Sequence, residues 1–287
     1  MPGKIMPTDL IRMKRQGEKI LMTVCYDYPS AKLVDQSGID SIIVGVSLGK
    51  AVLGYEGSIP VTVEEVLHHT KAVCRGAKSK LVISDMPFLS CVTKEGALKN
   101  TGILVKEGGA QGVKIEGGGK RPEILRTVVE AGIPVLGHVG ASLFIMETDG
   151  AVEMGTTAEE AIHIIEDVKI QQDAGVFAIL MEAVPEEVMK EVMKVAKVPI
   201  VSLGSGSISD GQLLIFNEMM GLGEFFIPKC IKKYADLSKI ISDALKNFAD
   251  DVQQGKFPTA EHTFYMDKKE VQKMHNLLGE KDIKTKA

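Results

Sequence analysis

Short apolar runs alternate with longer amphipathic stretches along most of the 287-residue chain. The runs are almost continuous in Val, Ile, Leu and Met, which is typical of parallel strands that are covered on both faces. We expect eight strands, at 19–27, 41–46, 80–88, 112–116, 134–140, 176–184, 199–206 and 225–229. The pattern predicts helices at 6–16, 28–36, 61–75, 94–108, 122–131, 157–174, 185–196 and 234–253. The helix at 61–75 should begin with a capping box of Thr62 and Glu65.

The number of strand–helix units favours a closed (β/α)8 TIM barrel, a fold that typically takes about 250 residues. An open doubly wound sheet is less favoured, and no GxGxxG motif follows the first strand to indicate dinucleotide binding. We assign residues 1–265 to one barrel domain with an N-terminal helix, and residues 266–287 to a C-terminal extension. In the extension, Val271, Met274, Leu277 and Leu278 recur at helical spacing, which suits docking on a neighbouring subunit.

The composition and charge of the chain limit the kinds of binding partner and the cellular location that we expect. The chain is 45% hydrophobic and 25% charged, as is usual for a soluble globular protein. The net charge is −4 and the basic residues are scattered, so neither nucleic acid nor a membrane surface is expected as a partner. Without a membrane-length apolar run or a signal-peptide core, we expect a cytoplasmic protein. The cysteines are few and widely spaced, which argues against a zinc site or a disulfide framework.

Polar residues gather where the apolar runs end. Lys114 and Glu116 stand at the end of the fourth run, directly before three glycines. Because a buried charge costs several kcal/mol unless it is paired or metal-bound, this stretch indicates a site. The other strand ends carry Asp27, Ser47, Asp85, His138, Glu182 and the 204–206 turn. Each has a simpler structural interpretation, such as a helix cap, but together they predict an active site, because strand ends meet at one mouth of a barrel.

The residue types at these ends indicate the chemistry. Asp85 and Glu116, on neighbouring strands, suit a hard cation such as Mg2+, which would polarise a ketone and stabilise an enolate. Zinc is less favoured because a His/Cys ligand set is missing. Glu182 lies in a run of Leu, Ile and Met, where burial favours the neutral form and suits proton transfer. Alternatively, Glu182 is simply the partner of Lys114.

Nine short motifs in colinear order resemble the ketopantoate hydroxymethyltransferase family, and the similarity runs from about residue 19 to 264. They are VGVSLGK (44–50), PVT (60–62), DMPF (85–88), VKIEGG (113–118), GHVG (137–140), MEAVP (181–185), SDGQ (209–212), IPK (227–229) and FPTAEHTF (257–264). The resemblance implies a (β/α)8 barrel of the isocitrate lyase/phosphoenolpyruvate mutase type that forms homo-oligomers. It implies one-carbon transfer from methylenetetrahydrofolate to 3-methyl-2-oxobutanoate, in pantothenate biosynthesis, through a metal-stabilised enolate.

The resemblance also implies roles for individual residues. Asp85 would be a ligand of Mg2+, and Glu116 a ligand directly or through water. Glu182 would be the catalytic base that removes the C3 proton of the substrate. The residues implied to bind the 2-oxo acid substrate are Ser47, Asp85, Lys114 and His138.

Two departures from the family pattern leave other functions open. Val46 stands where the family has an aspartate that binds the metal, and valine cannot coordinate a cation. The glycine-rich lid that carries an arginine in the family is replaced by an acidic segment at 144–155. One alternative is therefore a C–C bond lyase or transferase of the same superfamily that acts on another 2-oxo acid. The other is a catalytically weakened barrel that binds a small molecule or a partner protein.

Overall fold

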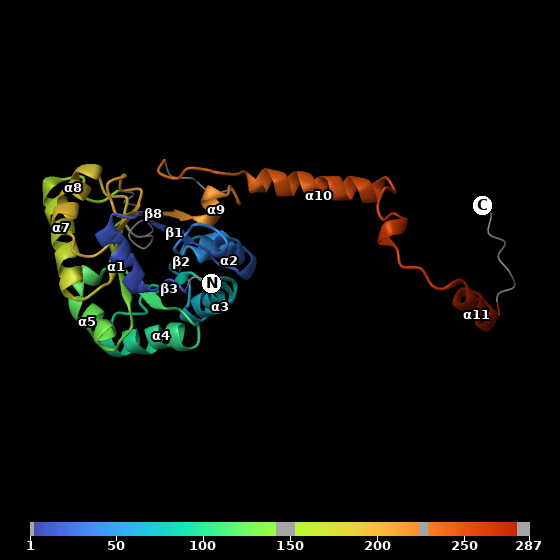
Figure 1. The fold of residues 1–287 in the computed structure, drawn as a ribbon, viewed down its shortest axis with the longest axis horizontal. Coiled ribbons are helices and arrows are strands. Elements are labelled where there is room, and N and C mark those ends of the chain that lie inside the picture. The colour runs from blue at the N-terminus through green and yellow to red at the C-terminus, as the bar shows by residue number, and fades with distance from the viewer. Residues whose placement is uncertain (1–2, 142–152, 224–228, 280–287) are drawn as a thin grey trace. The chain divides into compact units, whose positions relative to one another are not determined.

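The computed structural model describes residues 3–141, 153–223 and 229–279. Eight parallel strands pair in chain order, and the last pairs with the first, so the sheet closes into a barrel (Figure 1). This confirms the predicted (β/α)8 architecture. The strands are β1 (Ile20–Val24), β2 (Ser41–Val44), β3 (Leu81–Asp85), β4 (Gly112–Ile115), β5 (Val135–Gly140), β6 (Ala178–Glu182), β7 (Ile200–Leu203) and β8 (Gly211–Ile215).

Helices follow most strands, close to the predicted positions. They are α1 (Pro7–Gln16), α2 (Tyr28–Asp35), α3 (Val63–Gly76), α4 (Lys94–Lys106), α5 (Pro122–Glu130), α7 (Ala158–Asp173), α8 (Glu186–Val195), α9 (Phe216–Met219), α10 (Leu237–Gln253) and α11 (Lys268–Leu278), with the single turns η1 (Gly49–Leu53), η2 (Gly118–Lys120) and η3 (Ala260–His262). The predicted capping box of α3 is present. The Thr62 hydroxyl accepts from the Glu65 N–H at 3.2 Å, and the Glu65 carboxylate accepts from the Thr62 N–H at 2.8 Å.

The eighth strand lies earlier in the chain than the sequence pattern predicted. The expected strand at 225–229 falls largely outside the described residues, whereas Gly211–Ile215 closes the barrel against Ile20–Val24. The prediction was wrong because β8 is only partly buried and opens with a glycine and an exposed Gln212, so its apolar run is short. Gly211 is needed for the close pairing, since an added Cβ would lie 2.3 Å from the carbonyl oxygen of Ile20.

The chain divides into two compact units, Met1–Ala235 and Asp236–Ala287. The first contains the barrel and the second contains α10, η3 and α11. The sequence analysis had placed the end of the barrel domain at residue 265, with the predicted helix at 234–253 inside it. Neither α10 nor α11 buries a residue, so the spacing alone did not show which surface covers their apolar stripes.

The barrel interior is filled by aliphatic side chains from all eight strands, such as Ile43, Ile83 and Leu213. Charged or titratable side chains are buried near the carboxyl ends of β3, β4 and β5, at Asp85, Lys114 and His138. None of the described helices is long and apolar enough to cross a membrane.

Candidate active site

A cavity of about 40 Å³ opens at the carboxyl ends of the strands. Its apolar wall includes Leu180 of β6 and Leu213 of β8. Five of the side chains that the sequence nominated line the same cavity: Ser47, Asp85, Lys114, Glu116 and Glu182. We call it the small cavity. The parallel strands bring these residues together from β2, β3, β4 and β6, as expected for the mouth of a barrel.

Lys114 holds the two candidate metal ligands together. Its ammonium donates to Asp85 Oδ2 at 2.8 Å and to Glu116 Oε1 at 2.9 Å, and all three side chains are buried. Burial alone would lower the pKa of Lys114, but the two carboxylates outweigh burial and raise it, so the ammonium stays charged. The alternative pairing of Lys114 with Glu182 is not observed.

Asp85 and Glu116 share Lys114 as a partner, but their pKa values shift in opposite directions. Burial would raise the pKa of Glu116, but Lys114 and His138 outweigh it and hold that pKa well below its usual value. For Asp85, burial outweighs the attraction of Lys114, and the pKa is raised. Glu116 therefore stays ionised at neutral pH, whereas Asp85 is the more easily protonated of the two carboxyl groups.

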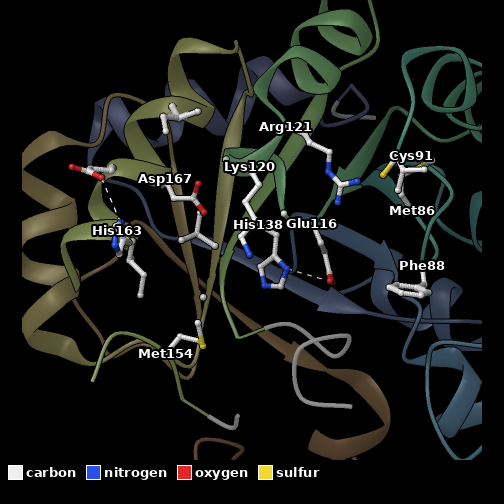
Figure 2. A pocket seen from close by; sticks show the side chains of 18 of the residues that line it. Met86, Phe88, Cys91, Glu116, Lys120, Arg121, His138, Met154, His163 and Asp167 are labelled. Atoms are coloured by element: carbon white, nitrogen blue, oxygen red, sulfur yellow. Dashed lines mark ion pairs between the residues drawn. The ribbon is translucent and has the colours of Figure 1, made fainter. Parts of the chain in front are cut away.

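His138 joins Glu116 to the candidate base. Its Nδ1 lies 3.3 Å from Glu116 Oε1 (Figure 2). Its Nε2 lies 3.2 Å from Glu182 Oε2 without the alignment of a hydrogen bond. Burial and the Lys114 charge lower the pKa of His138, but Glu116 and Glu182 outweigh them and raise it to about 9. At neutral pH the imidazole is therefore a cation between two carboxylates. The purely apolar surroundings expected for Glu182 are interrupted by this ring.

Two of the nominated strand ends have structural roles instead. Asp27 caps α2, where its carboxylate accepts from the Ser30 N–H at 2.8 Å. The buried Ser205 hydroxyl donates to the Met181 carbonyl and accepts from the Val184 N–H, each at 3.0 Å. Both side chains satisfy nearby backbone groups, and neither lines the small cavity.

Sequence reasoning missed Tyr26, which directly precedes Asp27. Its hydroxyl lies 2.7 Å from Ser47 Oγ, and burial raises the pKa of the phenol, which therefore stays protonated. Glu218 of α9 was also missed, because the eighth strand was misplaced. Burial, followed by the charge of Glu182, raises the pKa of Glu218 to about 7. Glu218 is therefore a second carboxyl group whose charge interacts with that of the candidate base, Glu182.

The donor set can be tested against a divalent cation. Asp85 Oδ1 and Glu116 Oε2 are buried and have no hydrogen-bond partner among the described residues. Val46 is fully buried and contributes only its N–H, which donates to Asp85 Oδ2 at 3.3 Å. The described part of the chain contains no cluster of three His, Cys, Asp or Glu side chains placed to hold a metal. Two carboxylates with free oxygens fit Mg2+, which commonly completes its shell with water and substrate oxygens.

A second and much larger cavity, of about 660 Å³, lies beside the small one. We call it the wide cavity. Its walls come from the segment after β3, the segment after β4, the end of β5 and one face of α7 (Figure 2). Glu116 lines both cavities, so the two spaces meet at Glu116, and its partner His138 lines the wide one. The volume is in the range of sites that enclose a small molecule.

The family model of ketopantoate hydroxymethyltransferase matches residues 4–260. The chain belongs to this family. A relative named 3-methyl-2-oxobutanoate hydroxymethyltransferase from Clostridium botulinum (strain Alaska E43 / Type E3) is 42% identical over 264 residues, which cover 91% of this chain and 96% of the relative. A relative of the same name from Thermoanaerobacter sp. (strain X514) is 41% identical over 272 residues, covering 94% and 99%.

Solved structures of lower identity share the fold of this family member. A 2,3-dimethylmalate lyase, described as a member of the PEP mutase/isocitrate lyase superfamily, matches with a TM-score of 0.58 and 17% identity, covering 95% of this chain and 99% of that one. A phosphonopyruvate hydrolase in complex with oxalate and Mg2+ matches with a TM-score of 0.58 and 13% identity, covering 95% and 96%. These matches confirm the predicted barrel fold. The altered lid at 144–155 lies outside the described residues, except for 153–155.

Proposed function

We propose that the chain is a 3-methyl-2-oxobutanoate hydroxymethyltransferase that moves a one-carbon unit from methylenetetrahydrofolate to C3 of the 2-oxo acid. The observation that carries the proposal is the convergence of Ser47, Lys114 and Glu182 on one small cavity in a chain of this family. A cationic donor, a hydroxyl and a carboxylate base suit a small anionic substrate that must lose a proton from carbon.

Lys114 and Ser47 are the proposed anchors for the 2-oxo acid. An ammonium has three N–H donors, and Lys114 uses two of them on Asp85 and Glu116, which leaves one for a substrate oxygen. The protonated Tyr26 hydroxyl lies within hydrogen-bond distance of Ser47 Oγ. If Tyr26 donates to Ser47, the proton of Ser47 is free to point at the substrate. Lys114 is buried and Ser47 is half-buried, and both are paired in advance, so little reorganisation accompanies binding.

Glu182 is the proposed base. It takes the proton when the C3–H bond breaks, and the electron pair left on C3 forms the new bond to the one-carbon unit. Both bonds between the one-carbon unit and the carrier nitrogens break, and water supplies the hydroxyl of the product. The two nitrogens take the other water proton and the proton held by Glu182, so the carrier leaves as tetrahydrofolate. The His138 cation, 3.2 Å from Glu182, attracts the carboxylate and so helps to position it. A divalent cation held by Asp85 and Glu116 would polarise the 2-oxo group and so acidify the C3–H bond.

The proton-transfer step can be tested without the carrier. Incubated in D2O with Mg2+ and 3-methyl-2-oxobutanoate, the protein should exchange the C3 hydrogen for deuterium, as followed by NMR. Addition of methylenetetrahydrofolate should then produce the hydroxymethylated acid. Absence of both exchange and product at saturating substrate would refute the proposal.

Val46 favours a second candidate, a C–C bond lyase or transferase of this fold that acts on another 2-oxo acid. The buried valine stands where the family pattern has an aspartate, so one carboxylate fewer is available beside Asp85. This candidate predicts faster turnover of a different 2-oxo acid when a panel is compared under the same conditions. If 3-methyl-2-oxobutanoate is turned over at least as fast as every other acid of the panel, this candidate is eliminated.

We also propose that the protein forms homo-oligomers. The support lies in α10 and α11, each of which exposes apolar side chains, including Leu245 and Phe248 of α10 and Leu277 of α11. Groups of exposed apolar side chains commonly mark a surface that binds another protein chain. Sedimentation of the whole chain should show an assembly, and Phe248→Asp should shift it to a smaller species. A wild-type monomer at micromolar concentration would contradict this proposal.

A further inference from the structure

The wide cavity contains a carboxylate, Asp167 of α7, that has no role in the proton transfer proposed above. Asp167 is half-buried, and none of the described residues forms a hydrogen bond or an ion pair with it. Burial raises the pKa of Asp167, and Lys120 only partly opposes this effect. An acid that is desolvated but unpaired is costly, so a ligand that brings N–H donors would stabilise it.

The glycine run after β4 makes room for this carboxylate. A Cβ added at Gly119 would lie 1.1 Å from Asp167 Oδ1, so only glycine lets the side chain take its position. Gly119 and Asp167 both line the wide cavity, and Figure 2 shows Asp167 directed toward the space beside Lys120 and His138. The fold therefore holds an acceptor in a defined place on the cavity wall.

The opposite side of the wide cavity has different chemistry. There, Arg121 follows η2, and Met86 and Phe88 follow β3. No ion pair or hydrogen bond of the Arg121 guanidinium occurs among the described residues. A guanidinium is the side chain best shaped to take a carboxylate in two hydrogen bonds, and an aromatic ring offers a face for stacking.

We propose that the wide cavity binds the one-carbon carrier as a planar fused ring with an anionic tail, the Asp167 carboxylate accepting from adjacent N–H groups of the ring and the Arg121 guanidinium pairing with a tail carboxylate. In a carrier of this class the one-carbon unit lies between ring and tail. In the view of Figure 2, His138 and Glu116 lie between Asp167 and Arg121, so the reacting carbon is held where the two cavities meet. The inference rests on the proposed function, which supplies the chemistry of the carrier.

Binding of two probes by the whole chain tests this assignment. Calorimetry under anaerobic conditions would compare tetrahydrofolate with 6-methyltetrahydropterin, which has the ring but no tail. Asp167→Asn should weaken both probes by about tenfold to a hundredfold, because a paired charge-assisted acceptor is lost. Gly119→Ala should do the same by displacing Asp167. Arg121→Gln should weaken tetrahydrofolate about tenfold and leave the tail-less ring unchanged.

Matched variants serve as controls. Asp173→Asn changes an exposed acid of the same helix, and Arg126→Gln an exposed arginine of the next helix after η2, and each should bind both probes within about twofold of the wild type. The C3 exchange of 3-methyl-2-oxobutanoate, measured without carrier, shows whether each variant is folded at the small cavity. Unaltered binding by both Asp167→Asn and Gly119→Ala would overturn the ring assignment. An equal loss of both probes in Arg121→Gln would overturn the tail assignment.

The same measurements separate this inference from the proposed function. A wild-type protein that exchanges the C3 hydrogen but binds neither probe overturns the carrier site and leaves the proton-transfer site standing. One that binds both probes with the expected variant pattern but exchanges no hydrogen supports the carrier site and refutes the proposed proton transfer.

Discussion

Replacement of Lys114 by methionine should destabilise the barrel strongly, because it leaves two buried carboxylates without their shared cation. At an effective dielectric constant of about 20, unit charges at the observed 2.8 and 2.9 Å attract by about 6 kcal/mol each. The cost of desolvating three charged groups cancels most of this attraction. Removal of one partner from a buried pair nevertheless costs about 3–5 kcal/mol, since the remaining charge stays buried. We expect about 3 kcal/mol, because Glu116 keeps His138 as a partner.

The assay is urea unfolding followed by far-ultraviolet circular dichroism. Lys71→Met is the matched control, because Lys71 pairs with Glu107 at 3.7 Å with both side chains largely exposed, and such a pair contributes at most about 1 kcal/mol. In Lys114→Met, the pKa values of Asp85 and Glu116 should rise above those of the unfolded chain. The folded state then binds more protons, so the loss of stability should shrink as the pH falls toward 5.

The reasoning about buried charge is refuted if Lys114→Met costs less than about 1 kcal/mol at pH 7. A loss that does not change between pH 7 and pH 5 would refute the assignment of that loss to unpaired carboxylates. In that case lost packing of the lysine stem would explain the effect better.

Three further predictions concern the same site. Glu182→Gln should slow C3 exchange by about 10²–10⁴-fold, as expected for a lost base, while calorimetry still detects 2-oxo acid binding; exchange at the wild-type rate would remove Glu182 as the base. Because His138 has a pKa of about 9 against an ordinary 6.5, its contribution of about 3 kcal/mol should be complete below pH 6.5 and lost as the pH rises through 9. His138→Gln should flatten that dependence in unfolding curves, and an unchanged dependence would contradict it. Val46→Asp should lower the melting temperature in EDTA and bind Mg2+ at least tenfold more tightly by calorimetry, whereas equal affinity would show that position 46 does not face the cation.

Most of the barrel was predictable because its signature is local. A buried parallel strand is a short apolar run wherever it lies, and the Thr62–Glu65 capping box is complete within four residues. The error at the eighth strand has the same origin. Gly211–Ile215 is only partly buried, so it lacks the continuous apolar run on which the prediction depended.

The sequence predicted which residues of the candidate site come together, but not which of them contact one another. Parallel strands deliver their carboxyl ends to one mouth, so strand-end residues such as Asp85, Glu116 and Glu182 converge whatever the details of packing. The same argument wrongly included Asp27 and Ser205, because a polar residue at a strand end serves equally well as a cap or a backbone partner. Only distances between strands distinguish these uses.

The sequence by itself determined the order and type of the first seven strands with their helices, and the edge of the sheet at which polar side chains gather. Both follow from short-range periodicity and chain direction. The tertiary structure alone decided that Lys114 binds Asp85 and Glu116 and that His138 faces Glu182. It also decided that Asp167, from the middle of a helix, reaches over Gly119 into the wide cavity. These contacts depend on the register of neighbouring strands and on how closely a helix approaches a loop, which no local pattern of residues records.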